Sequence, residues 1–272
     1  MLMKPIRLLS AVAMLLCSLD TNGQPADNTA NPGRAPIYNI EHFDVLPMAM
    51  GRVDFLQSGY ALLFKYRDQS RAERGLQSFT ILSLVPPTTN HSEVVQAWNS
   101  YDDYLNHLVQ PHTVAFRFDL QNNPGLGGVC CIGSPIDDRQ YRLVQSIGTP
   151  WAAAAVPTAT SRTLFVISYV EFLPQANVEA GQAQLVLYGT TSRQANATNL
   201  ASYTVLRQLD RPNRFAVLEV WDSQKSYNAW QSADAARGFA ATLRPLLEAP
   251  MDHRLTSLCG TSFVANLGCA AP

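Results

Sequence analysis

The sequence predicts an α+β protein made of two tandem repeats, each with the element order β-α-β-β-α-β. The first observation behind this prediction is an internal duplication, because residues 90–120 match residues 213–243 without a gap at an offset of 123. A second block, residues 75–82, matches residues 199–206 at an offset of 124. Two matching blocks in the same order indicate a duplicated structural unit. The identical pairs in the longer block are Asn90 and Asn213, Val94 and Val217, Trp98 and Trp221, Ser100 and Ser223, Tyr104 and Tyr227, Phe116 and Phe239, and Leu120 and Leu243.

The second observation is a change of hydrophobic period inside residues 213–247. Residues 215–221 alternate as a strand does and are apolar on both faces, so we expect both faces of this strand to be covered. Asp222 or Ser223 then supplies a side-chain oxygen to the free amides at the start of a helix. We expect this helix to break near residues 232–234. Its apolar stripe comprises Tyr227, Trp230, Phe239, Leu243 and Leu246.

Both repeats are expected to follow the same course. In the first repeat, the predicted strands are residues 37–47, 79–85, 93–98 and 139–146, and the predicted helices are residues 56–66 and a helix capped by Ser100 that continues beyond Pro111. In the second repeat, the predicted strands are residues 163–173, 203–208, 215–221 and 254–257, and the predicted helices are residues 178–188 and the helix after residue 223. This order of elements is the ferredoxin-like arrangement.

The start of the chain has the features of an exported protein. Basic residues precede a short apolar run at residues 8–16, which is too short to cross a bilayer and is typical of a secretory signal. We therefore expect residues 1–23 to be a signal peptide, with cleavage after Ser18 or Gly23, and the protein to be secreted or periplasmic. Lipid attachment at Cys17 is disfavoured, because the preceding Met-Leu-Leu lacks the small residue that the attachment signal needs.

The remaining chain divides into four expected segments. Residues 24–36 are rich in Pro, Asn, Ala and Gly and are predicted to be a flexible leader. Residues 37–147 form the first domain, residues 148–162 a linker with two prolines, and residues 163–272 the second domain with a C-terminal tail. The 47% hydrophobic content can fill one large core or two smaller ones. The 20 basic and 21 acidic residues give no net field that would attract nucleic acid or an anionic membrane.

Export would leave four cysteines in an oxidising compartment, where an even number favours two disulfides. We expect Cys130 and Cys131 each to bond one of Cys259 and Cys269, because a disulfide between adjacent cysteines is strained. Free buried thiols are the alternative. A metal site is not expected, since the chain has no CxxC pair and its five histidines show no recognised ligand spacing.

Residues 218–247, LEVWDSQKSYNAWQSADAARGFAATLRPLL, resemble the core of the antibiotic biosynthesis monooxygenase family. The shared pattern is an acidic-x-Trp strand end, an aromatic helix and a second helix centred on Phe. The first repeat resembles the family through residues 97–116, AWNSYDDYLNHLVQPHTVAF, which include a His-x4-His spacing. The resemblance covers about residues 37–146 and 163–257. It implies that both halves of a dimeric α+β barrel lie in one chain, which would be a monomer acting as a pseudo-dimer.

The resemblance also implies an activity: oxidation of a hydroxylated aromatic compound or quinol by O2 without metal, flavin or other cofactor. Such a site needs a base for the phenolic proton, donors for the developing oxyanion and dry aromatic walls. His107 and His112 are the candidate bases by residue type, because imidazole titrates near neutral pH. Asn99 is a candidate polar group beside them. The alternative is that both histidines lie at the surface or at helix ends.

The candidate substrate-binding residues come from both repeats. In the second repeat, Trp230 replaces His107 and Ala235 replaces His112, so we expect one active pocket and one scaffold pocket. Glu219 lies among apolar neighbours, where desolvation would raise its pKa, unless it is a structural carboxylate bonded to backbone. The full set is Trp98, Tyr104 and Phe116 in the first repeat, and Glu219, Trp221, Tyr227, Trp230 and Phe239 in the second.

Two alternatives to this oxidation differ from it in the residues that they require. The haem-degrading branch of the family has a tryptophan at the position of Trp230 and an iron-binding histidine ten positions later. Here the later residue is Ala240, and the corresponding pair in the first repeat is His107 and Arg117, so haem degradation is not expected. The other alternative is a non-catalytic small-ligand-binding or scaffold protein that retains the barrel. A polar pair that converges on an apolar cavity would favour the enzyme.

Overall fold

The computed structural model describes residues 35–44, 53–84, 91–122, 137–154, 162–174 and 176–258. The first repeat has the predicted order of elements. They are β1 (Ile37–Asp44), α1 (Val53–Ser70), β2 (Leu76–Leu84), β3 (His91–Trp98), α2 (Tyr101–Leu108), α3 (Pro111–Asn122) and β4 (Asp137–Gly148). Ser100 caps α2 as predicted, because its hydroxyl oxygen accepts a hydrogen bond from the backbone N–H of Asp103 at 3.1 Å.

The second repeat follows the same course after a short helix, α4 (Trp151–Ala154). Its elements are β5 (Leu164–Glu171), α5 (Val178–Ala195), β6 (Leu200–Gln208), β7 (Arg214–Trp221), α6 (Gln224–Gln231), α7 (Asp234–Leu243) and β8 (Asp252–Leu258). Ser223 caps α6 through the backbone N–H of Ser226 at 3.2 Å. The predicted break in the second helix is confirmed, since α6 ends at Gln231 and α7 begins at Asp234.

The first helix of each repeat is longer than predicted. Both α1 and α5 span 18 residues, whereas the sequence predicted residues 56–66 and 178–188. The apolar stripe ends before the helix does, because the last turns bury small polar side chains in place of large apolar ones. Ser70 and Ser192 are these side chains, and both are fully buried. The extra turns matter for the site, because they carry the chain to Glu73.

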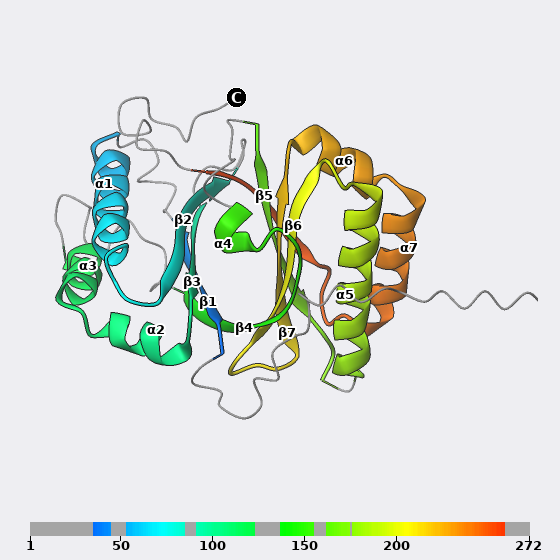
Figure 1. The fold of residues 1–272 in the computed structure, drawn as a ribbon, viewed down its shortest axis with the longest axis horizontal. Helices are drawn as coiled ribbons and strands as arrows, with labels where there is room; N and C mark the ends of the chain where they lie inside the picture. Colours follow the sequence, from blue (N-terminus) through cyan, green and yellow to red (C-terminus); the bar gives the residue numbers. More distant parts are fainter. Residues whose placement is uncertain are drawn as a thin grey trace, which may run out of the picture.

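The strands in the described residues close into one antiparallel barrel in the order β1-β3-β2-β8-β5-β7-β6-β4. Two pairings between the repeats complete it: β4 pairs with β6, and β2 pairs with β8. Figure 1 shows the helices in two groups on opposite sides of this barrel, α1 to α3 on one side and α5 to α7 on the other. The predicted fold class is therefore confirmed: two tandem ferredoxin-like repeats form a pseudo-dimeric α+β barrel within one chain.

The barrel explains why the strands are apolar on both faces. In β7, Val217 and Trp221 pack with the helices of the second repeat. Their neighbours Ala216, Leu218 and Val220 belong to another cluster, which includes Ile40 of the first repeat and so lies inside the barrel. Each repeat therefore has its own core between sheet and helices, and both share the barrel interior.

Several predictions fall on residues outside the described ranges. The signal peptide, the leader and all of Cys17, Cys130, Cys131, Cys259 and Cys269 are in this group, so export and the disulfides stay predictions. None of the helices in the described part of the chain combines the length and the apolar composition that a membrane crossing requires.

Candidate functional site

The space between the sheet and the helices is built alike in the two repeats. In the first repeat, the ring of Tyr66 from α1 stacks on Phe116 from α3, with centroids 4.1 Å apart and planes 4° apart. In the second repeat, Tyr188 from α5 stacks on Phe239 from α7 at 3.9 Å and 12°. The duplication therefore conserves the aromatic wall of this space. The differences between the repeats lie in the polar groups around it.

A row of three amides crosses the helix-facing side of the sheet in the first repeat. Gln140 of β4 lies opposite Asn39 of β1, which in turn lies opposite Gln96 of β3. The amide N–H of Gln140 donates to the Asn39 oxygen at 3.2 Å. The indole N–H of Trp98 donates to the Gln96 oxygen at 3.0 Å, which places the row on the same face as that tryptophan. The row spans three neighbouring strands beneath the helices.

Glu41 lies on this same face, two residues beyond Asn39, and is buried. Its Oε1 accepts hydrogen bonds from the amides of Asn39 at 3.1 Å and Gln96 at 2.9 Å. Its Oε2 has no hydrogen-bond partner within the described residues. Burial, together with the opposing carboxylate of Asp138, raises the pKa of Glu41 to about 8, against the lowering effects of Arg117 and the two amides. Glu41 is thus a carboxyl group that can hold or release a proton near neutral pH.

Polar side chains that are partly exposed to solvent lie on the strand and helix next to Glu41. Asp138 of β4 lies opposite Glu41 and accepts hydrogen bonds from the Tyr104 hydroxyl at 3.1 Å and from Arg117 at 2.9 Å. The side chain of Arg117 is 39% exposed and that of Asp138 20%. Partly exposed charged groups therefore lie near the buried carboxyl group and influence its charge.

The corresponding face of the second repeat is largely apolar. By strand register, Val166, Glu219 and Leu255 take the places of Asn39, Gln96 and Gln140. Glu219 accepts the indole N–H of Trp221 at 2.7 Å, and burial raises its pKa to about 7. Ser168 stands where the first repeat has Glu41. It lies opposite His253 and hydrogen-bonds to it at 2.7 Å.

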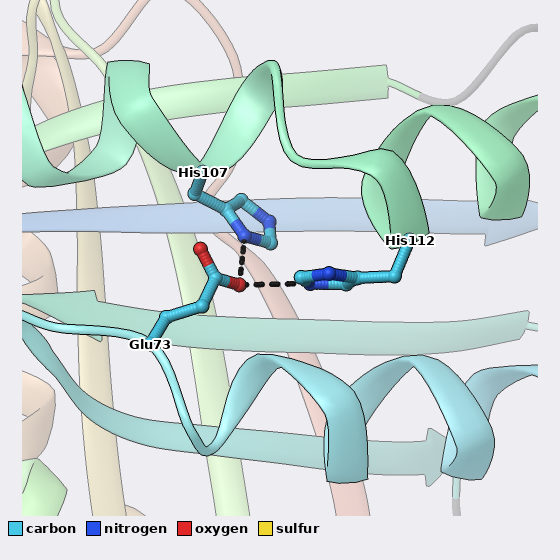
Figure 2. A group of neighbouring side chains, drawn as sticks. All are labelled: Glu73, His107 and His112. Atoms are coloured by element: carbon cyan, nitrogen blue, oxygen red, sulfur yellow. Dashed lines mark hydrogen bonds and ion pairs between the residues drawn. The ribbon is translucent and has the colours of Figure 1, made fainter.

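His107 and His112 meet at a carboxylate that the sequence did not indicate. Figure 2 shows both imidazoles directed at Glu73, which follows α1. Glu73 Oε1 lies 2.6 Å from Nδ1 of His107 and 2.9 Å from Nε2 of His112. His107 is 1% exposed, and its Nε2 lies 2.6 Å from the Tyr66 hydroxyl. Both nitrogens of His107 are therefore engaged by protein groups.

Burial determines the protonation states of His107 and Tyr66. Burial lowers the pKa of His107, although Glu73 opposes this effect, and burial raises the pKa of Tyr66 far above its ordinary value. The neutral imidazole then donates from Nδ1 to Glu73 and accepts the Tyr66 O–H at Nε2. In the second repeat, Trp230 takes the place of His107 and donates its indole N–H to the Tyr188 hydroxyl at 2.8 Å. The tyrosine hydroxyl therefore donates this hydrogen bond in the first repeat and accepts it in the second.

The structure brings most of the predicted first-repeat residues together. The ring centroids of Trp98 and His107 are 4.7 Å apart, and those of His107 and His112 are 5.9 Å apart. Asn99 is the exception, because the structure does not place it with the others. Its side chain is exposed and accepts a hydrogen bond from Gln77 at 2.6 Å, because the strand ends at Trp98 and the chain turns outward. Asn39 supplies the buried amide instead.

The predicted second-repeat residues also form one group. Trp221, Tyr227 and Trp230 are buried in a single cluster, with Phe239 packed against it. Glu219 hydrogen-bonds to an indole rather than to backbone, and its raised pKa agrees with the expected desolvation.

Residues 177–242 match the family model for antibiotic biosynthesis monooxygenase. No match was found among curated proteins. Among solved structures, a protein of Fusobacterium nucleatum assigned as a monooxygenase is 14% identical with a TM-score of 0.63, covering 82% of this chain and 92% of its own. A protein of Lactobacillus acidophilus with the same assignment is 12% identical with a TM-score of 0.58, covering 82% and 94%. An anthrone oxidase-like protein is 14% identical with a TM-score of 0.56, covering 83% and 92%.

At these identities the solved structures establish the fold alone. The family match covers α5, β6, β7, α6 and most of α7, and so includes most of residues 218–247, on which the resemblance was based, but not residues 97–116. The predicted resemblance is confirmed: residues 177–242 match the antibiotic biosynthesis monooxygenase family model, within a fold that most of the chain shares with solved monooxygenase-like structures.

Proposed function

We propose that the protein is a cofactor-independent monooxygenase that oxidises a hydroxylated aromatic compound or quinol with O2, and that its first repeat holds the active site. The observation that carries this proposal is the placement of Glu41. It combines a buried carboxyl oxygen without a partner among the described residues, a row of amides beside it, and the partly exposed Asp138–Arg117 ion pair on the neighbouring strand and helix. The same positions in the second repeat are Ser168 and a mainly apolar row. The family match supports the reaction class.

The proposed role of Glu41 is to accept the phenolic proton of the substrate at Oε2. A carboxyl group of ordinary pKa is a weak base toward a phenol, whose pKa is about 10. The raised pKa of Glu41, about 8, brings base and phenol closer and so favours proton transfer. The amides of Asn39 and Gln96 hold Oε1 and leave Oε2 free for this step.

The resulting phenolate supplies all the electrons that O2 requires. One oxygen atom becomes bonded to a ring carbon and ends as a carbonyl oxygen, and the other leaves as water. The substrate loses two hydrogens and gains one oxygen atom, so a phenol becomes a quinone and no external reductant is consumed. The stacked rings of Tyr66 and Phe116 form an apolar wall beside this site. His107 positions Tyr66 through the 2.6 Å contact at its hydroxyl.

The test is oxygen consumption by the purified, chelator-treated protein with a panel of phenols and quinols, followed by 18O2 labelling of the product. The proposal expects uptake above the rate of autoxidation and one labelled oxygen atom per product molecule. Saturable binding of a phenol without oxygen uptake would instead favour the non-catalytic ligand-binding protein. The Glu41→Gln variant removes the proton acceptor and keeps the shape of the side chain. In a catalytic protein it should therefore lose oxygen uptake, whereas in a ligand-binding protein it should not change oxygen uptake.

A further inference from the structure

We infer that Glu73, His107 and His112 form a binding site for one divalent transition-metal ion. Their donor atoms, which are one Glu73 carboxylate oxygen, His107 Nδ1 and His112 Nε2, lie within 4.8 Å of one another. Figure 2 shows the three side chains converging from separate segments: the turn after α1, the end of α2 and the start of α3. The site goes beyond the proposed oxidation, which uses no metal.

The donor set selects the class of ion. Imidazole nitrogens suit Zn²⁺, Fe²⁺, Co²⁺ and Cu²⁺, whereas Mg²⁺ and Ca²⁺ prefer sites built from oxygen atoms. Two histidines and one carboxylate are three protein ligands, which leaves at least one coordination position for water. Donors bound to one such ion lie roughly 3 Å apart. The two contacts to Glu73, at 2.6 and 2.9 Å, would widen slightly on metal binding, and the two imidazole nitrogens, which lie within 4.8 Å of each other, would move closer together.

The surroundings supply an outer shell for the ion. When His107 binds metal through Nδ1, its proton moves to Nε2, which then donates to the Tyr66 oxygen 2.6 Å away. The hydroxyls of Ser70, 3.4 Å from His112 Nε2, and Thr113, 3.3 Å from His107 Nδ1, lie beside the donors. Tyr66 contacts the second nitrogen of His107, and metal-bound imidazoles commonly have a hydrogen-bond partner there, because it fixes the ring orientation.

Access and charge are also suitable. His107 forms the closed inner side of the site, while the side chains of Glu73 and His112 are 13% and 16% exposed. An ion can thus enter from the side of Glu73 and His112. The carboxylate of Glu73 neutralises half of the charge of a divalent ion.

The second repeat provides an internal comparison. Tyr188, Ser192 and Arg193 match Tyr66, Ser70 and Arg71 at an offset of 122, and at that offset Ala195 matches Glu73. Trp230 and Ala235 match the two histidines. In the second repeat, none of the three equivalent positions carries a side chain that binds metal ions, while the surrounding tyrosine and serine are the same. The three donors differ together, as expected for a shared function.

The test uses the chelator-treated full-length protein with its cysteines alkylated, titrated with Co²⁺ and followed by visible absorption, and with Zn²⁺ by calorimetry. The inference predicts saturable 1:1 binding. Glu73→Gln and His112→Ala should each weaken it at least tenfold, and Tyr66→Phe should weaken it less. His253→Ala, which removes a histidine outside the cluster, should leave affinity unchanged.

Circular dichroism establishes that each variant is folded, and His112, which is partly exposed, is the substitution least disruptive to packing. Absence of saturable binding by the parent would overturn the inference. So would equal affinities in the parent, Glu73→Gln and His112→Ala. Because binding is measured without substrate, this result is independent of whether the protein oxidises phenols.

Discussion

Gln96 and Glu219 occupy equivalent positions in the two repeats, and each accepts the indole N–H of the tryptophan two residues later. The distances are 3.0 Å from Trp98 to Gln96 and 2.7 Å from Trp221 to Glu219. The first repeat has a neutral amide here and places its carboxyl group on the neighbouring strand, at Glu41. The second repeat keeps the carboxyl group beneath the tryptophan. The buried carboxyl group of the first repeat is therefore one strand away from that of the second, and lies opposite Asp138 and near Arg117.

Replacing Glu219 with glutamine should change the pH dependence of stability. Burial raises the pKa of Glu219 in the folded state to about 7, above the ordinary 4.5 of the unfolded chain. The folded state therefore binds the proton more tightly, and this contribution to stability is lost as pH rises from about 4.5 through 7. Glu219→Gln should exceed the parent in stability at pH 8 by on the order of 3 kcal/mol, and by much less near pH 4.

Thermal unfolding at several pH values measures this difference. Glu248→Gln, at an exposed position, is the control and should follow the parent at every pH. Parallel curves for the parent and Glu219→Gln would mean that Glu219 has no raised pKa.

Two glycines in the second repeat should respond oppositely to alanine. A Cβ at Gly189 of α5 would lie 2.2 Å from the ring of Tyr203, because the helix packs closely on β6. A Cβ at Gly238 of α7 would meet nothing within 4 Å. Gly189→Ala should destabilise the protein by about 1–3 kcal/mol through overpacking. Gly238→Ala should stabilise it by up to about 1 kcal/mol through helix propensity.

Chemical denaturation with urea provides both values. The two substitutions are matched, since each adds one methyl group to a helix of the same repeat. A stabilising Gly189→Ala would contradict the close approach of α5 to the sheet.

The repeats, caps and helix break could be predicted because their signals are local. Ser100 and Ser223 each stand directly before a helix, and the apolar stripe is interrupted near Ser232. Closure into a barrel could not be obtained from these signals, because the β4–β6 and β2–β8 pairings join distant segments. It came from the family resemblance.

The polar groups of the site were harder to predict for the same reason. The pairing of Asn39 with Gln96 depends on strand register over 57 residues, which no local pattern encodes. Glu73 lies in a turn without periodicity, 34 residues before His107. Glu41 alone offered a local signal, since strand alternation places it on the same face as Asn39.

Removing the imidazole of His107 should reduce both stability and oxidation. His107→Ala leaves the Tyr66 hydroxyl and Glu73 without their shared partner and opens a cavity, which should cost about 2–4 kcal/mol. Misplacement of Tyr66 beside the substrate should lower kcat roughly 10²-fold. His253→Ala should keep the parental kcat.

Steady-state kinetics at a temperature well below both unfolding midpoints separates the two effects. An unchanged kcat in folded His107→Ala would exclude a role for this histidine in positioning the site.

The dependence of kcat/KM on pH for phenol oxidation by the chelator-treated protein tests the central claim most directly. If Glu41 accepts the phenolic proton, only its ionised form is active, so kcat/KM should rise with pH and level off above an inflection near 8. Glu41→Gln should lose at least about 10²-fold across the range while remaining folded, because it loses the base and not the packing. Glu248→Gln should reproduce the parental profile. A Glu41→Gln variant with the parental rate and the same inflection would contradict the assignment of the active site to the first repeat.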